Sequence, residues 1–254
     1  MIADPLVVPL ALFVFGTILG SFFNVVIYRL PRGQSLVAPG SRCPHCGRPI
    51  RWWDNIPLLS FANLRGRCRH CGRPIGWRYP AVEFATGALL VLLWFHFAPQ
   101  GRPLALANAA ILSLLLVPIF FIDLEHRLVP NAITYPGIVI GLILAGAAGR
   151  LVDALLTGAG AGAFFFAVAV VSRGGMGGGD VKLAAMLGVF LGWPDAAVAI
   201  LLAFIGGAAV GVGLIAARLR TRKDAIPFGP ALAAGAIVAL FAAGPLVRWY
   251  LGLQ

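Results

Sequence analysis

The apolar stretch "LALANAAILSLLLVPIFFI", residues 104–122, decides the fold class of this chain. It holds no charged side chain and has the roughly 20 residues that a helix needs to cross the hydrocarbon core of a bilayer. The whole chain agrees, because 60% of its 254 residues are hydrophobic, only 11% are charged, and the mean hydropathy is +0.91. Soluble domains carry about 25% charged residues. We therefore predict an integral membrane protein.

Similar stretches recur and predict an all-α polytopic membrane protein with about eight transmembrane helices. The first stretch lacks a leading basic cluster and is too long for the apolar part of a signal peptide, so we expect it to remain as an anchor. The predicted spans are residues 5–28, 81–97, 104–122, 132–148, 152–171, 182–193, 196–217 and 229–247. The predicted divisions are a first transmembrane helix (1–28), a polar insert (29–80) and a seven-helix membrane domain (81–254).

The distribution of Lys and Arg predicts the orientation, because these residues gather in the cytoplasmic loops of membrane proteins. With the N-terminus outside, only Arg102, Arg150 and Arg248 of the 20 Lys and Arg residues face outward. The insert then lies in the cytoplasm, and so do the loops next to Asp123 and Asp180.

The polar insert contains all four cysteines, arranged in a repeat: "RCPHCGRPI" at 42–50 and "RCRHCGRPI" at 67–75. Two Cys-x-x-Cys turns can offer four thiolates to one tetrahedral zinc ion, and the glycine after each second cysteine permits the left-handed backbone of such a turn. We predict a small zinc-ribbon-like domain with Cys43, Cys46, Cys68 and Cys71 as ligands. Disulfides are the alternative, which a reducing cytosol disfavours. His45 and His70 are alternative ligands, but four thiolates already complete the shell.

The insert also carries ten arginines, from Arg29 to Arg78. A basic zinc ribbon can bind nucleic acid, but a domain tethered beside an anionic leaflet attracts the same arginines to lipid headgroups. We therefore expect anionic phospholipids as partners and no nucleic acid. Trp52, Trp53 and Trp77 would be interfacial anchors.

Asp123 and Asp180 stand next to apolar stretches in a chain that has only nine acidic residues. Each has an ordinary explanation: Asp180 can cap a helix, and Asp123 can belong to a polar loop that ends at Pro130. However, the sixth stretch (182–193) is too short to span the bilayer. Either the bilayer thins there, or the segment 174–179 dips inward and lines protein or a watery cavity. An ionisable side chain at membrane depth is a functional candidate.

Two carboxylates that meet in water can hydrolyse a peptide bond, one activating water and the other donating a proton to the substrate carbonyl. A helix N-terminus favours an anion and a helix C-terminus disfavours one. We predict that Asp180 is the base and Asp123 the acid. A metal held by these two, Glu125 and His126 is a minor alternative.

The ordered motifs resemble those of the prepilin peptidases, bacterial members of the Gly-x-Gly-Asp intramembrane aspartyl proteases. The resemblance covers nearly the whole chain. The motifs that carry it are "LGSFFNVVIYRLPRG" (19–33), the two cysteine turns, "DNIPLLSFANLRGRC" (54–68), "RYPAVE" (78–83), "IDLEHRLVPN" (122–131), "GMGGGDVKLAAMLG" (175–188) and "IPFGPAL" (226–232). The chain departs from the family pattern at Asn131, where relatives often have Asp, and at Ile122, where presenilin-type proteins have Tyr.

The resemblance implies a multi-pass enzyme of the bacterial inner membrane whose active site faces the cytoplasm. It implies cleavage, after a glycine, of the short basic leader of type IV prepilins and type II secretion pseudopilins, with Asp123 and Asp180 as the catalytic pair. It also implies N-methylation of the new N-terminus with S-adenosylmethionine, an activity of the cysteine-bearing region. Glu83 is the acidic residue next to that region, and an interfacial carboxylate is its plainer explanation.

Further residues are candidates for substrate binding. Gly177 and Gly179 allow close backbone approach, and Lys182 can pair with an acidic substrate residue, influence Asp180, or simply extend to the interface. Pro227, Phe228, Gly229 and Pro230 interrupt the last helix, and their main chain can bind an extended peptide, although helix initiation also explains them.

Two other function classes are open. Intramembrane aspartates beside glycine-broken helices also occur in proton-coupled transporters, which usually show matched halves that are absent from this sequence. A membrane-tethered zinc-ribbon scaffold is the other class, but it leaves Asp180 unexplained. The sequence does not indicate the oligomeric state.

Overall fold

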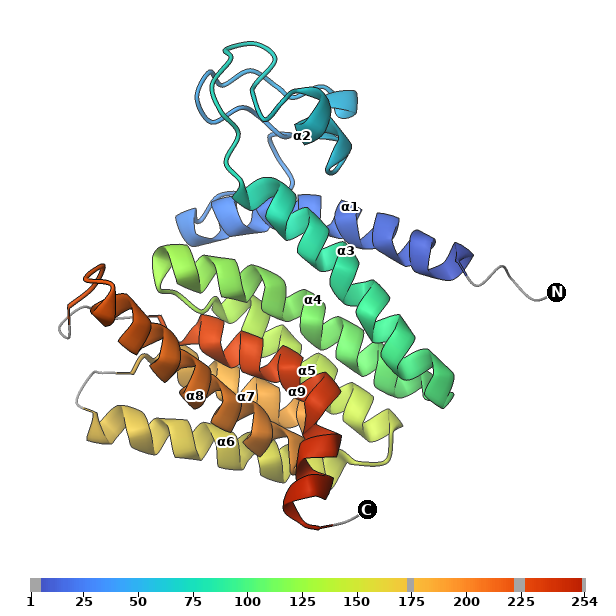
Figure 1. The fold of residues 1–254 in the computed structure, drawn as a ribbon, viewed down its shortest axis with the longest axis vertical. Coiled ribbons are helices and arrows are strands. Elements are labelled where there is room, and N and C mark those ends of the chain that lie inside the picture. Colours follow the sequence, from blue (N-terminus) through green and yellow to red (C-terminus); the bar gives the residue numbers. More distant parts are fainter. Residues whose placement is uncertain (1–5, 173–175, 222–226, 253–254) are drawn as a thin grey trace. The chain divides into compact units, whose positions relative to one another are not determined.

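The fold is all-helical, as the apolar stretches predict (Figure 1). The structure is a computed structural model and describes residues 6–172, 176–221 and 227–252. Each of the eight predicted spans coincides with a helix. These helices are α1 (Val7–Arg29), α3 (Arg78–Phe97), α4 (Pro103–His126), α5 (Asn131–Ala147), α6 (Leu151–Val171), α7 (Gly178–Leu191), α8 (Asp195–Ala216) and α9 (Gly229–Tyr250).

Six of these helices are long and apolar enough to cross a membrane by length and composition. The other two are shorter, with 17 residues in α5 and 14 in α7. A 14-residue helix is about 21 Å long, which is less than the ~30 Å hydrocarbon layer. Eight complete spans therefore remain a prediction, while a membrane domain with at least six crossing helices fits the described residues.

The chain divides into two compact units, Met1–Leu106 and Ala107–Gln254. In the first unit, α1 packs along α3. The two backbones approach closely, because a Cβ added to Gly20 would lie 2.6 Å from the Cα of Glu83. Along the chain, three short helices separate α1 from α3, namely η1 (Leu30–Arg32), η2 (Trp52–Asn55) and α2 (Leu59–Asn63). A fourth, η3 (Ala98–Gln100), follows α3.

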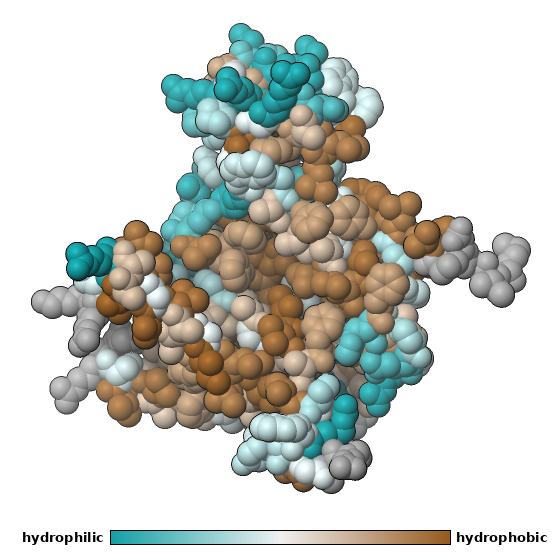
Figure 2. Space-filling model, in the orientation of Figure 1, coloured by the Kyte–Doolittle hydropathy of each residue, from teal (hydrophilic) through white to brown (hydrophobic). Residues whose placement is uncertain are grey.

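The second unit has α7 at its centre, where it packs against α5, α6, α8 and α9. Because neighbours surround it, the side chains of Leu183, Met186, Leu187 and Phe190 are fully buried. Outer helices instead expose large apolar side chains such as Phe166. Figure 2 shows one face of the molecule, on which hydrophobic residues spread over the helices, while hydrophilic residues gather on the cysteine-bearing segment and in smaller groups near helix ends.

The start of α7 differs from the expected boundary. The helix begins at Gly178 and not at residue 182, so Asp180 lies inside its first turn and Gly177 occupies the capping position. Residues 174 and 175 of the glycine run, which would dip inward if the bilayer does not thin, lie outside the described residues. Helix α5 begins at Asn131 directly after Pro130, as expected.

Candidate active site and candidate metal centre

Asp123 lies in the last turn of α4, and its side chain is buried. The backbone N–H of Gly229, at the start of α9, donates a hydrogen bond of 3.0 Å to its Oδ2. A Cβ added to Gly229 would lie 2.6 Å from the same oxygen, so only glycine allows this approach. The sequence suggested that Gly229 binds substrate main chain, and its N–H instead contacts Asp123.

Asp180 is the third residue of α7 and is also buried. Its Oδ2 accepts a hydrogen bond of 3.3 Å from the N–H of Gly177, and its own N–H donates to the carbonyl oxygen of Gly177 at 3.1 Å. This reciprocal pair fixes the first turn of α7. The ordinary explanation of Asp180 as a helix-end residue is therefore partly right, but the carboxylate faces the protein interior.

The two aspartates come from helices far apart in sequence, yet their carboxylates lie close enough for their charges to interact. Val129 packs at the same place, since a Cβ added to Gly179 would lie 3.0 Å from the Val129 Cβ. The structure thus gathers Asp123, Asp180, Gly177, Gly179 and Gly229 in one region of the second unit.

Lys182 follows Asp180 on α7, and its Nζ donates to the side-chain oxygen of Asn131 on α5. The same ammonium lies 5.6 Å from the ring centre of Tyr135. Asn131 therefore holds Lys182 as a neutral acceptor.

Phe228 stacks with two other aromatic rings just before Gly229. Its ring centre lies 5.1 Å from that of Phe204 on α8 and 6.1 Å from that of Phe165 on α6. Pro230 follows in the first turn of α9, where its fixed φ suits helix initiation. The aromatic cluster and the proline fix the backbone at Gly229, whose N–H holds Asp123. Pro227 is half-buried.

The four cysteines of the first unit form two equivalent turns. In each turn the N–H of the first cysteine bonds to the carbonyl oxygen of the arginine five positions later, at 3.0 Å for Cys43 and 2.9 Å for Cys68. Gly47 and Gly72 have φ of +69° and +67°, so glycine is required at both positions, as predicted. In the described residues these turns carry isolated β-bridges and no strand.

All four sulfurs lie within 4.8 Å of one another, and none is in a disulfide. Backbone N–H groups of Cys71 and His70 face the sulfur of Cys68 and lower the pKa of its thiol to about 7. Although the N–H of Arg73 favours the thiolate of Cys71, burial and the neighbouring sulfurs raise the pKa of Cys71 to about 11. The four sulfurs are therefore close enough together to hold one metal ion.

His45 and His70 point away from the sulfur cluster toward arginines of the opposite turn. Nδ1 of His70 lies 3.4 Å from an Arg48 nitrogen, and Nδ1 of His45 lies 3.5 Å from an Arg73 nitrogen. The two turns are thus linked by a reciprocal pair of contacts, and the sulfurs alone face the candidate metal position.

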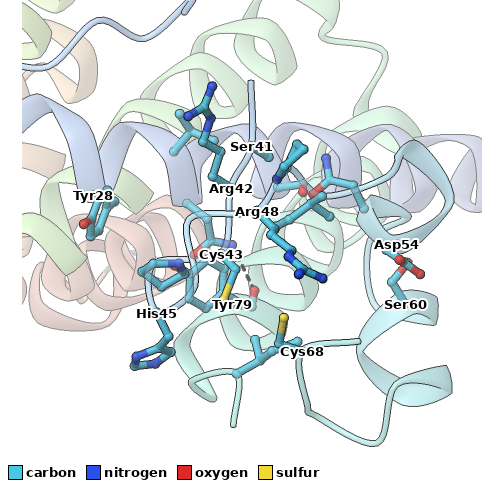
Figure 3. Close-up of a pocket in the computed structure, with 18 of the residues that line it drawn as sticks. Tyr28, Ser41, Arg42, Cys43, His45, Arg48, Asp54, Ser60, Cys68 and Tyr79 are labelled. Carbon is cyan, nitrogen blue, oxygen red and sulfur yellow. Dashed lines mark hydrogen bonds between the residues drawn. The ribbon is translucent and has the colours of Figure 1, made fainter. Parts of the chain in front are cut away.

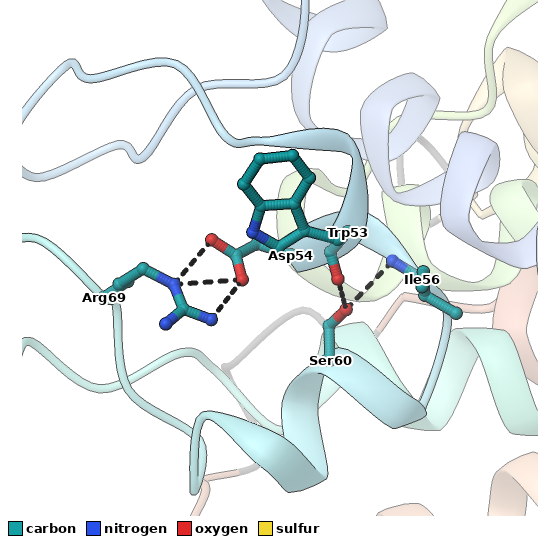
Figure 4. A network of polar contacts seen from close by, with 5 residues as sticks. All are labelled: Trp53, Asp54, Ile56, Ser60 and Arg69. Carbon is teal, nitrogen blue, oxygen red and sulfur yellow. Dashed lines mark hydrogen bonds and ion pairs between the residues drawn. The ribbon is translucent and has the colours of Figure 1, made fainter.

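Two further contacts fasten the segment between the turns (Figure 4). Arg69 donates to both carboxylate oxygens of Asp54, with the shortest distance 2.6 Å. This hydrogen bond lowers the pKa of Asp54 below its ordinary value. Ser60 donates to the carbonyl oxygen of Trp53 at 2.8 Å and accepts from the N–H of Ile56 at 2.9 Å. The sequence offered no signal that singled out these partners.

A cavity of about 730 Å³ lies within the first unit, between the cysteine turns and the facing ends of α1 and α3 (Figure 3). Its lining includes Asn24, Tyr79 and Glu83 from the two helices and Cys43 and Cys68 from the turns. Glu83 is buried, and its Oε2 accepts a hydrogen bond of 2.8 Å from the N–H of Leu58. The carboxylate that the sequence placed at an interface therefore lies at the wall of a cavity.

Comparison with known proteins connects both sites to one family. Residues 14–97 match the family model described as the bacterial peptidase A24 N-terminal domain, and residues 110–212 match the one described as the type IV leader peptidase family. A prepilin leader peptidase/N-methyltransferase of Aeromonas hydrophila is 39% identical over 94% of this chain and 92% of its own length. The chain belongs to the type IV leader peptidase family. The resemblance drawn from the ordered motifs is thereby confirmed.

Other members of the type IV leader peptidase family share the same name and a similar identity. The protein of Bacillus subtilis is 36% identical over 94% of this chain and 96% of its own length. That of Myxococcus xanthus is 45% identical over 81% of this chain and 63% of its own length. No solved structure matches the chain. The family models cover the cysteines and both aspartates, whereas Gly229 lies beyond the matched residues.

Proposed function

We propose that this protein is a membrane aspartyl endopeptidase that removes the leader of prepilins and then N-methylates the new N-terminus. Its relatives carry both activities in their name. The observation that carries the proposal is the pair of buried carboxylates on α4 and α7, each bonded to a backbone N–H and close enough for their charges to interact.

In this proposal an ionised Asp180 activates a water molecule and a protonated Asp123 donates to the carbonyl of the scissile bond. Asp180 lies in the first turn of α7, where the helix dipole and the Gly177 N–H stabilise an anion. Asp123 lies in the last turn of α4, where the dipole opposes one. Like charges at short range also favour one shared proton, so the pair titrates as a unit.

The proposed substrates are type IV prepilins and type II secretion pseudopilins, cut after a glycine. Gly177 and Gly179 leave room for the extended strand, and Lys182, Pro227, Phe228 and Pro230 are proposed to line its path. For Gly229 the hydrogen bond to Asp123 supports a positioning role instead. Most of the binding would come from the apolar helix of the substrate, since a basic leader gains little from a chain of net charge +11.

The proposed methyl donor is S-adenosylmethionine, which supplies a methyl group on a positively charged sulfur. The cavity of the first unit has a volume within the range of small-molecule sites. Zinc on Cys43, Cys46, Cys68 and Cys71 is proposed as a structural ion, because four thiolates leave no open position for a substrate.

We further propose eight crossing helices in the bacterial inner membrane, with both sites on the cytoplasmic side and the arginine-rich insert against anionic phospholipids. The excess of Lys and Arg on one side of the predicted topology supports this orientation. Neither a transporter nor a scaffold is favoured, because the relatives are enzymes by name and the aspartates are held in fixed positions.

The test is coexpression of a type IV prepilin with the wild type, Asp123→Asn, Asp180→Asn and Asp195→Asn. Asp195 is the matched control, because it also lies in the first turn of a helix. We expect leader removal by the wild type and the control and none by the other two, at equal membrane levels. Cleavage by either of the first two variants would refute the catalytic assignment. The mass of the product N-terminus reports methylation separately.

A further inference from the structure

The cavity of the first unit presents two buried acceptors on the wall formed by α1 and α3. Asn24 is 3% exposed and Glu83 is 8% exposed, and both line the cavity. Tyr79 and Glu83 lie one helical turn apart on α3, and Asn24 and Gly20 lie one turn apart on α1. Because Gly20 touches the backbone of Glu83, and Asn24 bonds to Tyr79, the two acceptors occupy neighbouring places on this wall.

The Asn24 amide is oriented by its own hydrogen bonds. Its Nδ2 donates to the carbonyl oxygen of Tyr79 at 3.1 Å and to that of Gly20 at 3.3 Å. Both amide hydrogens are therefore used, and the opposite atom must be the oxygen. That Oδ1 has almost no exposed surface and no hydrogen-bond partner among the described residues, so a ligand in the cavity reaches it only when the side chains around it move slightly. A buried acceptor without a donor is destabilising, which is a reason to look for a ligand that donates to it.

In the part of the chain that the structure describes, no cation contacts Glu83, although several arginines line the cavity. Arg29 donates to the carbonyl oxygens of Ser35, Pro39 and Gly40. Arg69 is held by Asp54, and Arg48 and Arg73 face histidines. The described contacts of the Glu83 carboxylate are the N–H of Leu58 and the side chain of Ser21, which are both neutral. A carboxylate forms a stronger hydrogen bond with a charged donor than with a neutral one.

We propose that Glu83 and Asn24 bind the primary ammonium group of the methyl acceptor, the new N-terminus of the cleaved substrate. An ammonium group offers three donors, enough for the carboxylate and for Asn24 Oδ1 together. This proposal rests on the proposed methyltransferase function, and it names the residues that would bind the methyl acceptor.

The same two residues explain how the amine becomes reactive. The ammonium group transfers one proton to the Glu83 carboxylate, which leaves a lone pair on nitrogen. The nitrogen then bonds to the methyl carbon while the carbon–sulfur bond breaks and its electron pair leaves with sulfur. The product is an N-methylammonium group that carries the charge formerly on sulfur. Glu83 then releases its proton to solvent, so the exchange balances.

The experiment measures peptide binding to the full chain in nanodiscs, with no methyl donor present. The probes are a synthetic peptide with a free mature N-terminus and the same peptide with an acetylated N-terminus. The proteins are the wild type, Glu83→Gln, Asn24→Leu and the control Thr86→Val. Thr86 is a buried polar residue on α3 whose hydroxyl donates to Val82 and does not line the cavity.

We expect Glu83→Gln to weaken binding of the free-amine peptide roughly ten- to a hundredfold, as for the loss of a charged hydrogen bond. Asn24→Leu should weaken it less, and Thr86→Val should leave it unchanged. Acetylation should weaken wild-type binding by a similar factor and abolish the difference between the wild type and Glu83→Gln. Equal binding of the free and acetylated peptides to the wild type would overturn the proposal.

A second arm separates the acceptor amine from the amino group of the methyl donor. Binding of S-adenosylhomocysteine should change less than about twofold in Glu83→Gln. If Glu83→Gln loses S-adenosylhomocysteine binding but keeps peptide binding, Glu83 serves the methyl donor and the proposal is overturned. Leader cleavage by Glu83→Gln should match the wild type. If the wild type cleaves prepilin but never methylates it, the proposed methyltransferase function fails, whatever the peptide binding shows.

Discussion

Replacing Gly229 with alanine should disable the proposed peptidase site without removing either aspartate. The new Cβ would lie 2.6 Å from Oδ2, 3.0 Å from Cγ and 3.3 Å from Cβ of Asp123. The first distance is shorter than any ordinary contact, so the carboxyl group has to rotate or α9 has to shift. Either movement breaks the 3.0 Å hydrogen bond from the Gly229 N–H.

The size of the effect follows from that hydrogen bond. A hydrogen bond to a charged or reacting carboxyl group contributes about 1.5–3 kcal/mol, which is roughly a 10- to 150-fold change in rate. We expect Gly229→Ala to slow leader cleavage by a factor in this range or by more. The assay is steady-state cleavage of a purified prepilin in detergent, with thermal unfolding as the measure of folding.

Gly178→Ala is the matched control, because a Cβ at Gly178 meets no atom within 4 Å although the residue is two positions from Asp180. It should cleave prepilin at the wild-type rate. Near-normal cleavage by Gly229→Ala, or an equal loss in Gly178→Ala, would show that the contact between Gly229 and Asp123 does not position the catalytic group.

Three further predictions concern other contacts. Gly179→Ala should slow cleavage, because its Cβ would lie 3.0 Å from the Val129 Cβ. Val129→Gly in the same chain removes that Cβ and should restore part of the rate; a double variant no better than the single one would contradict this. Elemental analysis should find zinc in the wild type and in His45→Ala, since His45 faces Arg73, whereas Cys46→Ser and Cys71→Ser should lose the zinc and unfold at lower temperature. Asp54→Asn should lower the thermal stability of the first unit. Because Arg69 lowers the pKa of the folded carboxyl below 3.8, the contribution of this ion pair to stability is complete above pH 3.8 and is lost only as the pH falls through the lowered pKa. The difference in stability from the wild type should therefore be constant from about pH 8 to about pH 5.

The sequence predicted the helices well because apolar length is a local property. All eight stretches form helices in the described residues, and the largest errors, of four residues each, concern the end of α4 and the start of α7. There the glycines obscured the boundary, since a run of glycine usually indicates a loop. The reciprocal bonds between Gly177 and Asp180 extend the helix backward to Gly178, and hydropathy carries no information about them.

The candidate sites were predictable where spacing along the chain sets the geometry. The cysteine turns follow from Cys-x-x-Cys-Gly, and their sulfurs meet as expected. The N–H that holds Asp123 was not predictable, because Gly229 lies 106 positions away and its sequence motif indicated peptide binding or helix initiation. Likewise, the arginines of the insert were expected to face lipid, but Arg29 and Arg69 bond to the protein itself. Partners of this kind depend on tertiary packing.

The hydrogen bond between Gly229 and Asp123 also bears on biosynthesis. Both aspartates are translated well before α9, the last helix of the chain. A nascent chain that still ends before residue 229 therefore holds both carboxylates but not the donor that orients one of them. If that orientation is needed for peptide hydrolysis, the enzyme stays inactive on the ribosome and gains its activity only when its final helix inserts.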